Sequence, residues 1–139
     1  MIKTHHMPNK LIEVSRRFKE TEPEREERIQ NEIIVDAYDD DEVASSWYYY
    51  LDEMLHFPFT AMVHTHRSGN TSYASQVEIK EMAEMSRCGY GQMWVRGALS
   101  LQKNTPLHFF LSDITSVEED EERVMALEDW NYWCRNQLS

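Results

Sequence analysis

The sequence has 139 residues, of which 41% are hydrophobic and 12% aromatic, enough for a single domain with its own core. Its formal net charge of −11 argues against nonspecific binding to nucleic acid, because such binding needs a basic surface. There is neither an apolar run of about eighteen residues nor a basic-then-apolar leader, so the sequence predicts a cytoplasmic protein without a membrane span. Cys88 and Cys134 are expected to be reduced, packed thiols rather than a disulfide.

Residues 1–24 form a charged N-terminal segment. Its few large apolar residues are Leu11, Ile12, Val14 and Phe18. They predict a short amphipathic helix around residues 9–20, followed by a solvated linker through Pro23. The charge run Arg25–Arg28 that follows is expected to be a solvated face.

Two helices joined by an acidic connection are predicted between residues 25 and 57. Pro23 and the glutamates after it suit the first turn of a helix that extends to Tyr38. Its buried stripe, at a spacing of four residues, is Ile29, Ile33 and Ala37. The run Asp39–Asp41 breaks this period and can cap a second helix from about Asp41 to His56. The buried stripe of the second helix is Ala44, Trp47, Leu51 and Met54. Together the two helices form an αα-hairpin, which Pro58 ends.

Beyond Pro58 the pattern changes to short strands separated by turn residues, which predicts a small antiparallel barrel or sheet over residues 58–114. The candidate strands are Thr60–His64, Val77–Met85, Met93–Leu101 and Leu107–Leu111. A last helix is predicted over residues 115–138, because Ser116 and Glu119 have the spacing of a capping box. Its buried stripe is Val124, Leu127, Trp130 and Trp133. Residues 25–139 are therefore expected to form one α+β domain.

The strongest chemical signal is a window of negative charge. From Ile29 to His66 there is no Lys or Arg, and eight carboxylates supply −8 of the net charge of −11. Crowded carboxylates repel one another, and a hard cation with oxygen ligands removes that penalty. Calcium or magnesium is therefore the first ligand to test. An EF-hand is excluded, because its loop needs a glycine at the sixth position and no glycine precedes Gly69.

Three strings of residues resemble the CcbP-like calcium-binding protein family, known first from cyanobacteria. They are NEIIVDAY (Asn31–Tyr38), WYYYLDEMLHFPFTA (Trp47–Ala61) and LEDWNYW (Leu127–Trp133). The resemblance covers about residues 28–133, with a weak match over Val63–Gln92. It implies an acidic helical hairpin packed on a small SH3-like antiparallel barrel, with a C-terminal helix. It also implies calcium binding by carboxylates around the hairpin.

Six carboxylates near the hairpin connection are the predicted metal ligands. They are Asp36, Asp41, Glu42, Asp40, Asp39 and Glu32. Asp36 comes first because it lies inside a matched string, and Asp41 and Glu42 fall where the family tends to be acidic. The other two aspartates fall where the family is less uniformly acidic. Glu32, one turn before Asp36, adds a ligand or only shapes the field. Asp52 and Glu53, at the far end of the second helix, could form a second and weaker site.

These observations predict a calcium-binding protein, without an EF-hand, that acts as a cytoplasmic calcium buffer or sensor. The alternative is an acidic interaction module or inhibitor that binds a basic surface of a partner protein, with association steered by charge. No nucleophile, base and orienting residue are recognisably grouped, so catalysis is not expected.

Overall fold

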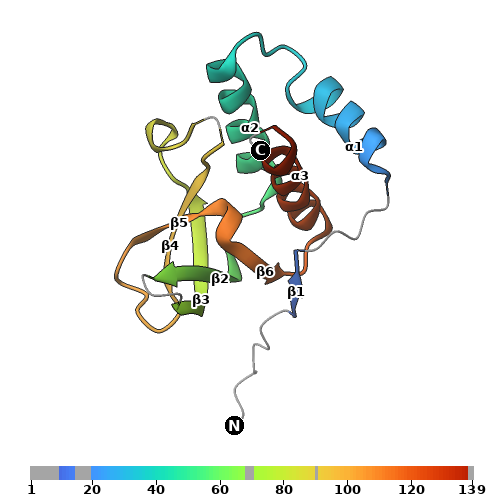
Figure 1. Ribbon diagram of the computed structural model, residues 1–139. Helices are drawn as coiled ribbons and strands as arrows, with labels where there is room; N and C mark the ends of the chain where they lie inside the picture. Colours follow the sequence, from blue (N-terminus) through green and yellow to red (C-terminus); the bar gives the residue numbers. More distant parts are fainter. Residues whose placement is uncertain (1–9, 15–19, 68–70, 90, 138–139) are drawn as a thin grey trace.

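The computed structural model describes residues 10–14, 20–67, 71–89 and 91–137, and these form an α+β fold (Figure 1). Its α-helices are α1 (Glu22–Arg28), α2 (Asp40–Met54) and α3 (Glu121–Gln137). Its strands are β1 (Leu11–Glu13), β2 (Phe59–Arg67), β3 (Thr71–Met82), β4 (Trp94–Leu99), β5 (Leu107–Phe110) and β6 (Ile114–Glu118). Three short helical turns are η1 (Ile29–Ile33), which is π-helical, and the 3₁₀ turns η2 (Met85–Arg87) and η3 (Leu111–Asp113). Within the described ranges, no helix is both long and apolar enough to cross a membrane.

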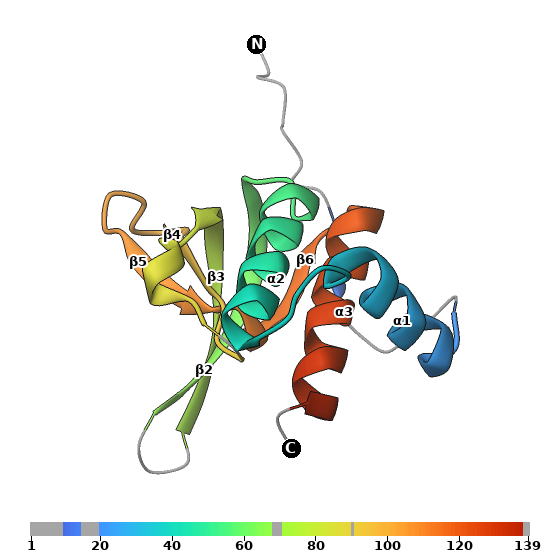
Figure 2. The same ribbon diagram turned by 90° about the horizontal axis from the view of Figure 1, so that it is seen from above.

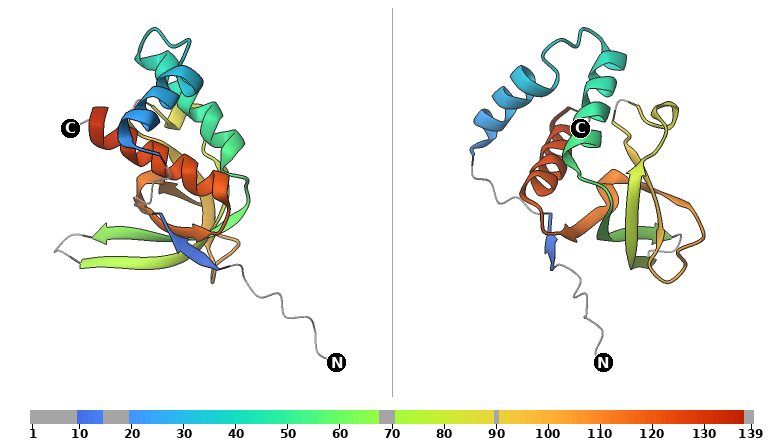
Figure 3. Two further views of the ribbon diagram at one scale, coloured as in Figure 1. Left: turned by 90° about the vertical axis from the view of Figure 1, so that its right-hand side faces the viewer. Right: turned by 180° about the vertical axis from the view of Figure 1, so that it is seen from behind.

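The six strands form one antiparallel sheet in the order β1-β6-β2-β3-β4-β5. Its centre is the long β2–β3 ribbon, which projects beyond the other strands (Figure 3). Among the described strands no pairing joins β1 to β5, so the sheet is open. The α+β class is therefore confirmed, whereas the predicted closed, SH3-like barrel is not.

The inner face of the sheet follows the two-residue alternation of a half-buried strand. In β2, the side chains of Phe59, Ala61 and Val63 are buried, and Val77 and Ile79 continue this face in β3. The strands also cross closely at one point. A Cβ atom at Gly97 of β4 would lie 2.0 Å from the carbonyl oxygen of Glu78 in β3, so only glycine fits there.

Helices α2 and α3 lie next to the sheet, and α1 lies on the side of α3 that faces away from α2 (Figure 2). The residues that join α2 to α3 are aromatic: the ring of Trp47 lies 5.3 Å from that of Trp130 and 5.8 Å from that of Trp133, centroid to centroid. The predicted stripe of the last helix is thus confirmed as core. The predicted hairpin is present in sequence order, but its two helices are separated by the C-terminal helix instead of packing mainly on each other.

The end of α2 is fixed by Arg123 of α3. Its guanidinium donates hydrogen bonds to the carbonyl oxygens of Leu55 at 2.7 Å, His56 at 2.6 Å and Glu118 at 2.9 Å. The same group stacks over the ring of Phe59, 4.3 Å from its centroid. The last carbonyl groups of a helix lack partners within the helix, so Arg123 caps α2 from a distant part of the chain.

Two predictions for the ends of the chain were wrong. Where the structure describes residues 9–20, it contains β1 paired with β6 instead of a helix; residues 9 and 15–19 lie outside the described residues. The last helix starts at Glu121, not at residue 115, because Ser116 belongs to β6. The side chain that accepts a hydrogen bond from the first turn of α3 is Asp120, from the N–H of Arg123 at 2.9 Å.

Candidate metal centre at an acidic helix connection

The acidic connection begins where α1 changes into the π-helical turn η1. The N–H of Ile34 bonds to the carbonyl of Ile29 at 3.1 Å, the i→i+5 pattern of a π-helix. Ile29, Ile33 and Ile34 are buried in the core, which fixes this end of the connection. The predicted helix to Tyr38 therefore stops at Ile33, and Asp36 lies in the turn that follows.

The other end of the connection is the start of α2. Asp39 is its N-cap, with an oxygen of the carboxylate accepting a hydrogen bond from the N–H of Glu42 at 2.9 Å. Asp40, Asp41 and Glu42 form the first turn, where the helix dipole favours negative charge. The predicted capping role of the aspartate run is confirmed. With Glu42, these aspartates place four carboxylates at one end of α2.

All six predicted ligands are exposed to solvent. None of them forms an ion pair with a cation of the described residues. Within the ranges that the structure describes, no three or more His, Cys, Asp or Glu side chains converge to hold a metal ion. The structure thus gathers the six carboxylates on one connection but does not bring them into a coordination sphere, and the ligand set remains a prediction.

The donor chemistry of this connection fits a hard cation, because every candidate ligand is a carboxylate. Asp52 and Glu53 are also exposed, but they lie at the opposite end of α2. At ~1.5 Å per residue, some 18 Å separates them from the first turn. They cannot share an ion with Asp39–Glu42.

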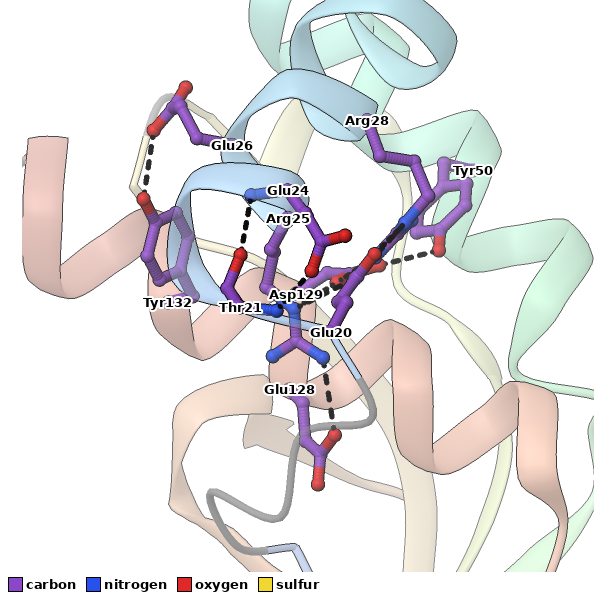
Figure 4. A network of polar contacts seen from close by, with 10 residues as sticks. All are labelled: Glu20, Thr21, Glu24, Arg25, Glu26, Arg28, Tyr50, Glu128, Asp129 and Tyr132. Carbon is purple, nitrogen blue, oxygen red and sulfur yellow. Dashed lines mark hydrogen bonds and ion pairs between the residues drawn. The ribbon is translucent and has the colours of Figure 1, made fainter.

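The main polar cluster of the described structure lies elsewhere, at Asp129 of α3 (Figure 4). Its side chain is fully buried, with one oxygen 2.6 Å from Nη2 of Arg28 and 3.1 Å from Nε of Arg25. Its second oxygen accepts a hydrogen bond from the hydroxyl of Tyr50 at 2.7 Å. Asp129 therefore ties both α1 and α2 to α3.

The outer side of this cluster is closed by Glu20, which accepts hydrogen bonds from Arg28 at 2.7 Å and Arg25 at 3.3 Å. The hydrogen bond from Arg28 holds the pKa of Glu20 below its usual value. Burial alone would lower the pKa of Arg28. Its hydrogen bonds to Glu20 and Asp129 outweigh burial, so the pKa of Arg28 is raised above its ordinary value. Burial raises the pKa of the Tyr50 hydroxyl, and the charge of Asp129 adds to this effect. The cluster thus favours the charged form of Arg28 and the neutral form of Tyr50.

The sequence prediction of a solvated charge run at Arg25–Arg28 was wrong for the two arginines. Arg25 is buried and Arg28 is largely covered. A signal was present in the late helix, where Glu128 and Asp129 stand between the apolar residues Leu127 and Trp130. A carboxylate inside an apolar stripe needs a cation, and two arginines three residues apart on one helix provide it.

Known proteins share the sequence pattern and the fold of this chain. The family model of CcbP-type proteins, described as calcium binding, matches residues 27–134. The crystal structure of CcbP from Anabaena is 37% identical, with a TM-score of 0.73, over 82% of this chain and 91% of that chain. A structure of a calcium-binding protein in the calcium-binding form is 36% identical, with a TM-score of 0.74, over 82% of this chain and 91% of that chain. No curated protein matches the sequence.

Proposed function

Because the chain belongs to the CcbP family of calcium-binding proteins, we propose that it binds calcium reversibly and acts as a cytoplasmic calcium buffer or sensor. One observation carries the proposal: the connection between η1 and α2 collects exposed carboxylates and no compensating cation from the described residues. Asp36, Asp39, Asp40, Asp41, Glu42 and Glu32 are the residues that would hold the ion. A hard cation bound by oxygen ligands neutralises their mutual repulsion.

The mechanism follows from the two ends of the connection. Asp36 lies in the turn after η1, whereas Asp41 and Glu42 lie in the first turn of α2. Without an ion their like charges push these two ends apart, and a bound ion draws them together. Calcium binding would therefore tighten the connection between α1 and α2. A buffer and a sensor differ in whether a partner then recognises the tightened form.

Thermal unfolding tests this function directly. With calcium at a hundred times its dissociation constant, folded-state binding would add about 2.7 kcal/mol to the free energy of unfolding. For a chain of this size we expect a rise of several degrees in Tm, with little change in millimolar magnesium. Asp36→Ala should remove the rise. Glu27→Ala, an exposed carboxylate on α1 outside the acidic window, is the matched control and should keep it.

The contrary result is also well defined. Equal calcium responses of the parent, Asp36→Ala and Glu27→Ala would exclude the connection as the binding site. The absence of any calcium response in the chelator-stripped parent would exclude folded-state calcium binding.

A second function is favoured by the apolar residues of the same connection. Val35 is 60% exposed and Tyr38 90% exposed, and both stand among the carboxylates. An aromatic ring surrounded by negative charge fits a basic segment of a partner protein. We therefore propose an acidic interaction module as the alternative. Binding of a lysine-rich peptide should then survive chelator, weaken with salt and be lost in Tyr38→Ala but not in Tyr49→Ala.

We also propose that the protein acts by binding and not by catalysis. Support comes from the predicted acidic residues, which are exposed and do not converge. They are not grouped with a nucleophile and a base in the way that catalysis requires. A negative net charge of −11 equally disfavours nucleic acid as a direct partner.

A further inference from the structure

The joint between the end of α2 and the start of α3 contains a histidine whose ring meets two carboxylates. Nδ1 of His56 lies 3.0 Å from Oδ2 of Asp120, and Nε2 lies 3.1 Å from Oε1 of Glu122. Asp120 caps α3, and Glu122 belongs to its first turn. The ring therefore connects α2 to α3 through both of its nitrogens. This contact lies at the opposite end of α2 from the acidic connection.

The number of protons on the ring decides whether both contacts are attractive. A neutral imidazole has one N–H donor, and its other nitrogen is an acceptor. An ionised carboxylate is an acceptor only, so a neutral ring can donate to Asp120 or to Glu122 but not to both. Both distances are hydrogen-bond lengths, and only the imidazolium can make both bonds. The geometry therefore fits the charged ring.

The backbone of His56 gives a second reason to expect a role for this side chain. Leu55 is the C-cap of α2, and His56, the next residue, has a φ of 55°, in the left-handed region. Glycine or asparagine is the usual residue at this position after a helix, because most side chains are strained in that conformation. The imidazole thus stands against the local backbone preference, and its two carboxylate contacts offset that cost.

A second cation at the joint does not change with pH. Arg123 donates hydrogen bonds to the carbonyl oxygens of Leu55 and His56, and a guanidinium stays protonated in proteins. The joint therefore combines a permanent cation with one that titrates. The other titratable residues from the elements that meet there are Lys10, Asp52, Glu53, Glu118, Glu119 and Glu121.

From these contacts we propose that His56, Asp120 and Glu122 form a pH-sensitive switch, which fastens α2 to α3 when His56 is protonated and loosens the joint when it is neutral. Histidine changes its charge between about pH 5 and pH 8. Loss of one proton turns a charge-assisted hydrogen bond into a contact between a nitrogen lone pair and a carboxylate. The hydrogen bonds of Arg123 remain, so the joint loosens without separating.

The stabilisation from this switch has a definite sign with pH. It is present at acid pH, where the ring carries both protons, and it is lost as the ring deprotonates. Below about pH 5 the carboxylates themselves begin to take up protons, so the effect is greatest just above that value. The side chains of His56 and Glu122 are 41% and 55% exposed, and solvent screening therefore keeps the effect modest.

The test compares the parent with His56→Asn by urea unfolding at pH 5.5 and at pH 8.5, in low salt with chelator. Asparagine tolerates the left-handed conformation, so the substitution removes the imidazole without adding strain. The ratio of folded-to-unfolded equilibrium constants, parent over variant, should be about three- to fivefold larger at pH 5.5 than at pH 8.5. An equal ratio at both pH values, or a larger one at pH 8.5, would overturn the proposal.

Glu122→Gln tests the second carboxylate without disturbing the cap of α3. The side chain of Glu122 is exposed, so this variant is expected to fold. In its background, His56→Asn should lose most of its pH dependence, because an amide can accept from the protonated ring or donate to the neutral one. Glu27→Gln, an exposed change on α1, is the control background and should keep that dependence. The same pH dependence in both backgrounds would exclude the role of Glu122.

Discussion

At the scale of single residues, Asp129 is the most constrained charge among the described residues. It is fully buried and contacts Arg25, Arg28 and Tyr50, which come from two other helices. A buried charge is tolerated only when it is paired and hydrogen bonded, and all the partners of Asp129 are supplied from outside α3. The packing of the three helices therefore depends on one carboxylate.

Replacing this carboxylate should be costly. In Asp129→Asn, both arginines lose the fully buried carboxylate that they share, and the expected loss is about 3–5 kcal/mol in the free energy of unfolding. Urea unfolding monitored by tryptophan fluorescence measures it. Glu27→Gln, at an exposed position on α1, should change the same quantity by no more than about 0.5 kcal/mol. Similar values for the two variants would contradict the assigned role of Asp129.

Two adjacent tyrosines give a closer comparison. Tyr50→Phe removes only the hydroxyl that donates to Asp129, and we expect a loss of about 1.5–3 kcal/mol because the acceptor is charged and buried. Tyr49→Phe makes the same chemical change on the exposed side of α2 and should be nearly neutral. The urea midpoints of the two variants, compared at equal m-values, give the difference between their free energies of unfolding. Equal losses would mean that the hydroxyl of Tyr50 does not stabilise the fold.

At the scale of elements, the contact between β3 and β4 sets a steric requirement. Gly97→Ala would bring a methyl group to 2.0 Å from the carbonyl oxygen of Glu78, and backbone cannot move aside as a side chain can. A loss of about 1–3 kcal/mol or more is expected from thermal unfolding. Gly89→Ala is the control, because no atom lies within 4 Å of its added Cβ. A Gly97→Ala variant as stable as Gly89→Ala would show that the strands can separate at this point.

The elements also show what the sequence can predict. The start of α2 was predicted to within one residue, since a run of aspartates before a helical stripe is a local signal. The prediction of an N-terminal helix was wrong, because Leu11 and Ile12 pair with β6, more than 100 residues later in the chain. No local signal indicates β6, and the signal for the burial of Arg25 lies about 100 residues later, at Glu128 and Asp129 in α3. Such features depend on contacts between distant segments, and the composition of the segment itself does not determine them.

At the scale of the whole molecule, the carboxylates with shifted pKa values determine the response to acid. Hydrogen bonds from Arg28 lower the pKa of Glu20. Burial opposes the same change in Asp120, but hydrogen bonds from His56 and the N–H of Arg123 lower its pKa overall. A lowered folded-state pKa gives stability that is present above the unfolded-state pKa and is lost as the pH falls through the folded-state value. Burial raises the pKa of Glu128, so protonation of this carboxyl at low pH favours the folded state instead.

We therefore expect the free energy of unfolding to fall as the pH drops below about 4, where these carboxylates become protonated. Urea unfolding from pH 7 to pH 3 measures the fall. Asp120→Asn should make the profile shallower, whereas Glu27→Gln should leave its shape unchanged. Stability that stays constant over this interval would contradict the roles of Glu20 and Asp120.

The clamp formed by Arg123 has a mechanical consequence for α2. Arg123 holds the carbonyl oxygens of Leu55 and His56, whereas the acidic first turn lies at the opposite end of a helix of 15 residues. At ~1.5 Å per residue, α2 is about 22 Å long. A rotation of about 5° about its fixed C-terminal end moves its N-terminal end by about 2 Å. A small rotation of α2 is thus enough to change the distance between the carboxylates of its first turn and Asp36, while its C-terminal end stays in place.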